Sequence, residues 1–230
     1  LLWWSGTISS FGDWATLFGS VALASYHGTE AGNSELTAIV PLIARIVPAL
    51  LSSFAGLIAD RYDKKIIMIF CDVIRMIFVM FLFFADNLYS IFLINFLSEI
   101  FSLIRQPSRE AVVPEIVNKE NLVKANSLFA IGTYATLPIA SLALGVVSDW
   151  NSLELTNETG NGWSGSIIFL FDTFTFMASA IILYFLKNQN KNTLNKKPDV
   201  SFKNFKDGLD YFFKTKDIRN ISFSISFCLV

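Results

Sequence analysis

The apolar residues of this chain occur in long uninterrupted blocks, and short polar segments separate the blocks. Five blocks lie at residues 36–59, 66–85, 88–104, 125–147 and 166–186. A helix rises about 1.5 Å per residue, so each block is long enough to cross or nearly cross a hydrocarbon layer about 30 Å thick. The blocks are also too long and too continuously apolar for the strands of a membrane barrel. The pattern therefore predicts an all-α polytopic membrane protein in contact with a lipid bilayer.

Two more apolar segments lie at the ends of the chain. Residues 1–24 are apolar apart from small hydroxylated residues and Asp13, and they lack the basic start and the cleavage pattern of a signal peptide. We expect a further span there, which brings the predicted total to six. Residues 218–230 are apolar but only about half as long as a crossing requires, and we expect them to begin a seventh transmembrane helix.

The order of these segments predicts three regions. Residues 1–186 are expected to form a six-helix bundle, and the polar segment 187–217 a cytoplasmic linker. Four apolar residues of the linker recur at helical spacing: Phe202, Phe205, Leu209 and Phe212. This spacing predicts an amphipathic helix on the membrane surface or on the protein's own cytoplasmic face. Six spans, a linker and the start of a seventh span are the layout of one half of a two-bundle transporter. We therefore expect a fragment whose C-terminal half is missing.

Among the connecting segments, only alternate ones contain lysine or arginine. These residues occur at 60–65, at 105–124 and from residue 187 onward, whereas 25–35, 86–87 and 148–165 contain none. Cationic loops stay on the cytoplasmic side of a membrane. We therefore expect both chain ends and the linker in the cytoplasm, and the protein in a plasma membrane such as the bacterial inner membrane. The net charge of −1 gives no reason to expect a nucleic-acid partner.

Ionisable side chains also fall inside the predicted spans, where each costs several kcal/mol unless it faces a cavity or a partner. They are Asp13, Arg45, Asp72, Arg75, Glu99 and Asp172. Asp13 and Arg45 lie at similar depth, which permits an ion pair, and Asp72 and Arg75 share one helix face. Glu99 lies near the level of the latter pair.

Two interpretations of these charges remain open. They form a structural network that locks the helices together, or one carboxylate carries a coupling proton. For the second role Asp13 is the first candidate.

The sequence offers no catalytic or cofactor-binding constellation. Cys71 and Cys228 lie within apolar segments and have no metal-ligand spacing, so we expect neither a disulfide, a metal site nor a cofactor. The segment GWSG at 162–165 has the form found in intramembrane serine proteases, but that chemistry needs a histidine base. His27 is the single histidine and belongs to another span. We therefore do not expect an enzyme.

The segment GLIADRYDKK at 56–65 joins the second and third predicted spans. It resembles the signature loop of the major facilitator superfamily, which has the form G-x-L-A-D-R-x-G-R-K. The matching residues are Gly56, Ala59, Asp60, Arg61, Lys64 and Lys65, while Ile58 replaces a leucine and Asp63 replaces the second glycine. Segments 105–128 and 206–220 are similar to loops of the branch that contains the enterobactin exporter and macrolide-efflux proteins.

This resemblance implies roles for particular residues. Asp60 would be a latch that docks against the other half of the transporter and holds the outward-open state, with Arg61, Lys64 and Lys65 as its switching partners. The alternative is that the loop only sets topology. In the family, the first and fourth helices line the cavity, which favours Asp13 and Glu99 over Asp172.

The fifth span departs from the family's drug–proton antiporters. Those proteins carry G-P-x-x-G-G, whereas this chain reads LPIASL. Pro138 remains and is expected to bend the helix, but the close packing of glycine is weakened.

Together these features predict a secondary active transporter that exports amphipathic small molecules, drug-like or siderophore-like, by alternating access. Proton coupling is a further expectation. The alternative is a polytopic sensor or scaffold with the same fold that moves no solute.

Overall fold

The computed structural model of the protein describes residues 1–30, 37–49, 62–148 and 167–186. Within these residues the secondary structure is helical, with no strand. The elements are α1 (Leu2–Glu30), α3 (Val40–Ala49), α5 (Lys64–Leu82), α6 (Leu88–Ile116), the short 3₁₀ helix η1 (Lys119–Asn121), α7 (Leu122–Tyr134), α8 (Thr136–Ser148) and α10 (Ile167–Tyr184).

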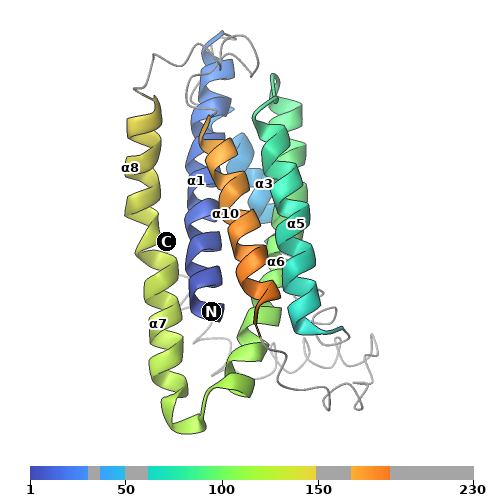
Figure 1. Cartoon of the computed structure of the whole chain (residues 1–230). Coiled ribbons are helices and arrows are strands. Elements are labelled where there is room, and N and C mark those ends of the chain that lie inside the picture. Colours follow the sequence, from blue (N-terminus) through green and yellow to red (C-terminus); the bar gives the residue numbers. More distant parts are fainter. Residues whose placement is uncertain (31–36, 50–61, 149–166, 187–230) are drawn as a thin grey trace, which may run out of the picture. The chain divides into compact units, whose positions relative to one another are not determined.

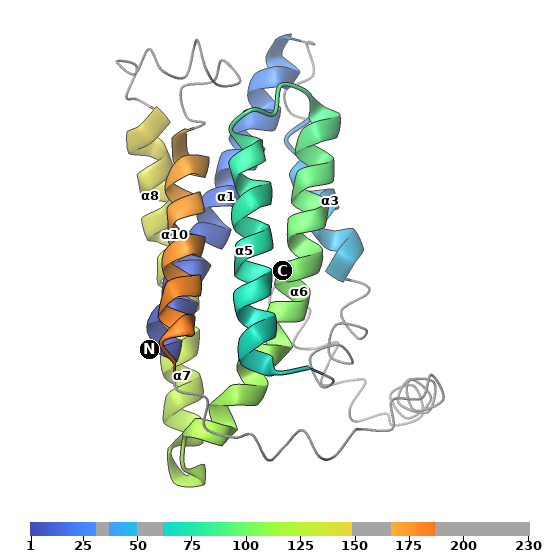
Figure 2. The same cartoon turned by 45° about the vertical axis from the view of Figure 1, so that its right-hand side comes forward.

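The helices run alternately up and down a bundle (Figure 1). Helices α1 and α5 begin at its lower end, α7 and α8 stack end to end in the same direction, and α3, α6 and α10 run back. We call this lower end the basic end, because Lys64, Lys65, Lys119 and Lys124 lie in the segments that meet there. Neighbouring helices pack in the order α8, α1, α10, α5, α6 and α3 (Figure 2).

The helices confirm the all-α fold predicted from the apolar blocks. Helices α5, α6 and α10 begin within two residues of the predicted blocks 66–85, 88–104 and 166–186. Three segments of the described chain are long and apolar enough to cross a membrane: Leu88–Ile116, Lys119–Val147 and Ile167–Tyr184. Helix α3 is the described part of the predicted span 36–59.

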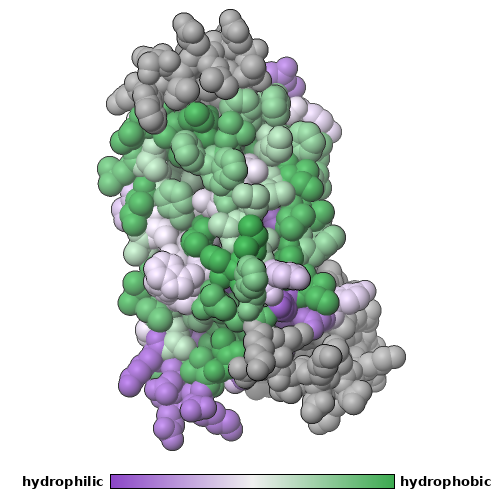
Figure 3. Space-filling model, viewed as in Figure 1, coloured by the Kyte–Doolittle hydropathy of each residue, from purple (hydrophilic) through white to green (hydrophobic). Residues whose placement is uncertain are grey.

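Helix α5 has its polar face inside and its apolar face outside. Asp72 and Arg75 are buried in the bundle, whereas Phe70, Ile77 and Phe81 on the outer face are 56%, 42% and 56% exposed. On the face shown in Figure 3, hydrophobic side chains cover most of the flank of the bundle, and a group of hydrophilic ones lies at the basic end. A helix of a water-soluble protein has its apolar face inside and its polar face outside. The opposite arrangement in α5 is typical of a helix surrounded by lipid.

Small residues let α1 approach α10 closely. Ser5, Ser9, Gly12, Thr16 and Ser20 recur every three or four positions along α1, and the four with side chains are buried. A Cβ atom added at Gly12 would collide with the carboxylate of Asp172 on α10. Small side chains at such spacing are the usual means of tight helix packing where water gives no hydrophobic drive.

The prolines of the segment 105–124 do not end the helix before them. Helix α6 continues well past the predicted span 88–104, to Ile116, with Pro107 and Pro114 inside it. Ser108 donates to the carbonyl oxygen of Ile104 at 3.0 Å, which supports the turn around Pro107. Asn118 stands at the N-cap of η1 but its side chain makes no capping hydrogen bond.

The fifth span is divided at Ala135, where α7 ends and α8 begins. Pro138 lies in the first turn of α8 and has no N–H to donate to the carbonyl of Tyr134, the last residue of α7. The hydroxyl of Thr136 donates to the carbonyl oxygen of Thr133 at 2.7 Å across the junction. The break therefore lies one turn before Pro138, because that is where the carbonyl group lacks its usual N–H partner.

Candidate functional site

Charged side chains from four helices meet inside the bundle. Arg75 of α5 donates to the carboxylate of Asp13 on α1, and Arg45 of α3 donates to the backbone oxygen of Asp13 at 3.3 Å. The Nε of Arg45 also lies 4.0 Å from a carboxylate oxygen of Glu99 on α6. We call Asp13, Arg45, Arg75 and Glu99 the midspan cluster. By helical rise, Asp13 and Arg75 each lie about 16 Å from the start of their helices at the basic end.

The midspan cluster balances its charges. Two arginines face two carboxylates, and the guanidinium of Arg75 lies 4.4 Å from the ring centre of Phe176 on α10. Asp13 and Arg45 do approach one another as the sequence indicated, but through the backbone oxygen of Asp13. The carboxylate of Asp13 instead forms an ion pair with Arg75, whose side chain is almost fully buried.

Asp172 of α10 is satisfied by hydroxyl groups. Thr16 of α1 donates to one carboxylate oxygen, and Thr175 donates to the other at 2.7 Å. The residue is only 1% exposed. It therefore belongs to the α1–α10 interface.

Asp72 pairs with Arg105, and not with Arg75 on its own helix face. The Nε of Arg105 lies 2.6 Å from one carboxylate oxygen of Asp72, and Ser179 donates to the other at 2.6 Å. Ser5 and Ser179 join α1 to α10 at 2.8 Å beside this pair. We call Asp72, Arg105, Ser5 and Ser179 the serine-bridged pair. Although Asp72 and Arg75 share a helix face, Asp72 is fully buried and contacts α6 and α10.

The described end of the signature loop holds the basic end together. Asp63 caps α5 by accepting from the backbone N–H groups of Lys65 and Ile66 at 2.9 and 3.3 Å. Lys64 pairs with Glu115 of α6, and Lys65 donates to the carbonyl oxygen of Leu186 at 2.6 Å, just beyond α10. Gly56, Asp60 and Arg61 lie outside the described residues. So do the linker 187–217 and the segment 218–230.

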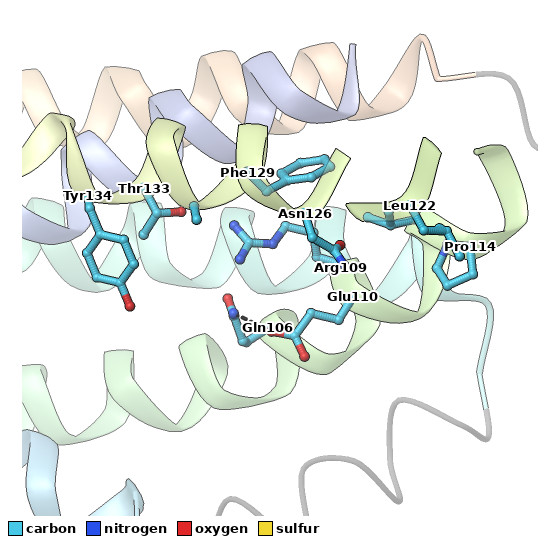
Figure 4. A pocket seen from close by; sticks show the side chains of 11 residues that line it. Gln106, Arg109, Glu110, Pro114, Leu122, Asn126, Phe129, Thr133 and Tyr134 are labelled. Carbon is cyan, nitrogen blue, oxygen red and sulfur yellow. Dashed lines mark hydrogen bonds between the residues drawn. The ribbon is translucent and has the colours of Figure 1, made fainter. Parts of the chain in front are cut away.

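A cavity of about 470 Å³ opens between α6 and α7 near the basic end (Figure 4). Its lining is part polar and part apolar: Gln106, Arg109, Glu110, Val113, Pro114, Leu122, Asn126, Phe129, Ala130, Thr133 and Tyr134. Arg109 lies 5.6 Å from the ring centre of Phe129. Gln106 donates to Glu110 at 2.6 Å on the opposite wall.

Several residues of these sites did not stand out in the sequence. Arg105 and Arg109 counted there only as cytoplasmic charges, because Pro107 suggested that the helix had ended. They are one helical turn apart, so a helix continued through the proline would have placed both on one inner face. Ser5 and Ser179 gave no signal, since serine is common in membrane helices.

The sequence profile of the Major Facilitator Superfamily matches residues 2–230. The chain belongs to this superfamily. It is thus a multi-pass membrane protein of a transporter family, and the superfamily expectation drawn from the loop at 56–65 is confirmed.

Among its curated relatives are transporters of one name from three bacteria. Over 161 residues the chain is 27% identical to the lysophospholipid transporter LplT of Escherichia coli strain SE11, covering 70% of this chain and 39% of the relative. The LplT of Enterobacter sp. strain 638 gives the same values. The LplT of Cronobacter sakazakii is 28% identical over 144 residues, covering 63% of this chain and 35% of the relative.

This superfamily member spans about two fifths of the length of the curated relatives that it matches. No solved structure matches the chain significantly. The relatives named here are lysophospholipid transporters, and they do not confirm the branch of enterobactin and macrolide exporters that the loops at 105–128 and 206–220 resemble.

Proposed function

We propose that the protein containing this chain is a secondary transporter that moves amphipathic small molecules across the plasma membrane by alternating access. The match to the superfamily over residues 2–230 carries this proposal. Such transporters bind substrate near the membrane midplane between two bundles. We take residues 1–186 as one bundle, 187–217 as the linker and 218–230 as the start of the second bundle.

The first substrate class is a single-chain phospholipid or a similar amphiphile. The relatives carry the name lysophospholipid transporter, and a lysophospholipid is an amphiphile with one acyl chain and one charged headgroup. The cavity between α6 and α7 offers both polar and apolar lining of the kind such a molecule requires. Export of drug-like or siderophore-like molecules, which the loop resemblance implies, is the alternative.

The midspan cluster is the place where we propose that transport is coupled to protons. Asp13 forms an ion pair with Arg75, and a carboxylate oxygen of Glu99 lies 4.0 Å from the Nε of Arg45. Protonation of Asp13 would release Arg75 from its partner and change the contacts among α1, α3, α5 and α6. The basic end is proposed to face the cytoplasm, with Asp60 as the latch and Arg61, Lys64 and Lys65 as its switching partners.

The test is transport by cells that lack their own lysophospholipid uptake and express the whole protein. A fluorescent lysophospholipid and a fluorescent cationic dye are supplied separately, with and without a protonophore. We expect the expressing cells to take up more lysophospholipid than cells with empty vector, and the protonophore to reduce that difference.

The other outcomes decide between the alternatives. Lower dye accumulation with unchanged lysophospholipid uptake would favour export of drug-like molecules. Equal accumulation of both probes in expressing and control cells would contradict transport and leave a sensor or scaffold.

A further inference from the structure

We propose that Arg109 binds the phosphate group of an amphipathic ligand in the cavity between α6 and α7. The inference deepens the proposed function and rests on it for the class of ligand. It does not use the midspan cluster or the signature loop.

Arg109 is a buried cation that forms no ion pair with any carboxylate of the described residues. It is 8% exposed, yet among the residues that the structure describes it makes no hydrogen bond and no ion pair. The other buried arginines are paired, Arg75 with Asp13 and Arg105 with Asp72. An unpaired buried charge is costly, so Arg109 is poised to receive an anion from outside the chain.

The neighbours of Arg109 leave its guanidinium directed into the cavity. Phe129 of α7 covers one side at 5.6 Å, and a Cβ atom added at Gly6 of α1 would lie 3.5 Å from a guanidinium nitrogen. The nearest carboxylate on the wall, that of Glu110, accepts from Gln106 at 2.6 Å. The side chains of Arg109, Gln106 and Asn126 face the same space (Figure 4).

This arrangement fits a phosphate that carries an apolar chain. A planar guanidinium binds two phosphate oxygens at once, and the amide N–H groups of Gln106 and Asn126 can donate to the others. Leu122, Val113 and Phe129 give the same cavity an apolar wall, which suits the first part of an acyl chain. A neutral amphiphile would leave the guanidinium without its partner.

The experiment is a competition assay on the purified whole protein in detergent, with a fluorescent lysophospholipid as the bound probe. Three competitors are compared: lysophosphatidylethanolamine, its headgroup glycerophosphoethanolamine without the acyl chain, and monoacylglycerol without the phosphate. We expect the lysophospholipid to compete at least about 10-fold better than either of the others.

Arg109→Gln should weaken lysophospholipid binding about 10- to 100-fold and leave the binding of monoacylglycerol unchanged. Arg109→Lys keeps the charge but not the planar guanidinium, so its lysophospholipid affinity should lie between those of the wild type and Arg109→Gln. The matched control is Lys119→Gln, which removes one charge from the exposed η1 at the same end and should bind like the wild type. Since Arg109→Gln could unfold, the thermal stabilisation of the wild type by lysophospholipid and by monoacylglycerol is also compared, and only the former should be large.

Equal lysophospholipid affinity for Arg109→Gln and the wild type would overturn the inference. If glycerophosphoethanolamine competed equally well, the site would bind a water-soluble phosphate ester without needing an acyl chain. That result would overturn the assignment of a lipid ligand. Arg109-dependent binding without uptake in the cell experiment would refute the transport proposal while leaving the site intact. Lysophospholipid uptake that does not depend on Arg109 would refute the Arg109 site and leave the transport proposal intact.

Discussion

At the scale of single residues, the buried ion pairs Arg75–Asp13 and Arg105–Asp72 each join two different helices. Arg75 contacts Asp13 on α1 and Phe176 on α10, although its own helix carries Asp72 one turn away. A pair within one helix would hold nothing together. A pair between helices fixes their relative depth, and each partner protects the other from an uncompensated charge.

Asp13→Asn should destabilise the protein by about 3 kcal/mol, because it leaves the almost fully buried Arg75 without its anion. Adding Arg75→Gln should then cost less than the same change in the wild type, by about 1 to 3 kcal/mol. The measurement is denaturant unfolding of the purified protein followed by tryptophan fluorescence. Additive effects within about 0.5 kcal/mol would show that the two side chains do not interact.

If Asp13 also carries the coupling proton, Asp13→Asn should abolish the response of transport to a protonophore. Ser179→Ala is the matched control, because it removes a buried hydrogen bond to Asp72 and costs about 1 kcal/mol without touching the midspan cluster. Protonophore-sensitive transport by Asp13→Asn would exclude Asp13 as the carrier.

The sequence identified most of the charged residues inside the bundle but not how they pair. Asp13, Arg45, Asp72 and Arg75 are recognisable because each interrupts an apolar block. The partner of Asp72 is on α6, and no spacing within the chain specifies which faces of two helices meet. Arg105 was hidden by Pro107, which normally ends a helix in water but is tolerated where neighbouring helices and Ser108 support the turn.

At the scale of elements, the close contact between α1 and α10 depends on a glycine. Gly12 of α1 packs directly against Asp172 and Thr175 of α10, whereas Gly145 of α8 has open space around it. Both residues are helical glycines. They therefore separate the effect of packing from the effect of backbone flexibility.

Gly12→Ala should destabilise the protein by about 1 to 3 kcal/mol, because the added methyl group displaces the carboxylate of Asp172. Gly145→Ala should be neutral or stabilising by up to about 1 kcal/mol, since alanine favours a helix. Thermal unfolding of the two variants side by side gives the comparison. Equal stability of both would contradict the close approach of α1 and α10.

Element boundaries were predictable where the polar turns are sharp. The turn at 86–87 is marked by Asp86 and Asn87, and Asn87 does cap α6 by accepting from the backbone of Ser90 at 2.8 Å. The division of the fifth span at Ala135 follows from Pro138. The extension of α6 to Ile116 did not follow, because its stability comes from contacts with other helices.

At the scale of the whole molecule, the apolar exterior and the one-sided charge predict the orientation in the membrane. Lys119 at the basic end and Asp86 at the other end are both exposed. In a background where Cys71 and Cys228 are replaced by serine, Asp86→Cys should react with a membrane-impermeant maleimide in intact cells. Lys119→Cys should react only after the membrane is opened. Labelling of Lys119→Cys from outside would reverse the proposed orientation.

The central claim is that this bundle belongs to a protein that moves a charged amphiphile across a membrane. The most direct measurement is flux of a fluorescent lysophospholipid into proteoliposomes that contain the whole purified protein, with external albumin removing the molecules that have not crossed. We expect albumin-resistant fluorescence to rise faster than in protein-free vesicles and to respond to an imposed pH gradient. The same rate with and without the protein would contradict the claim.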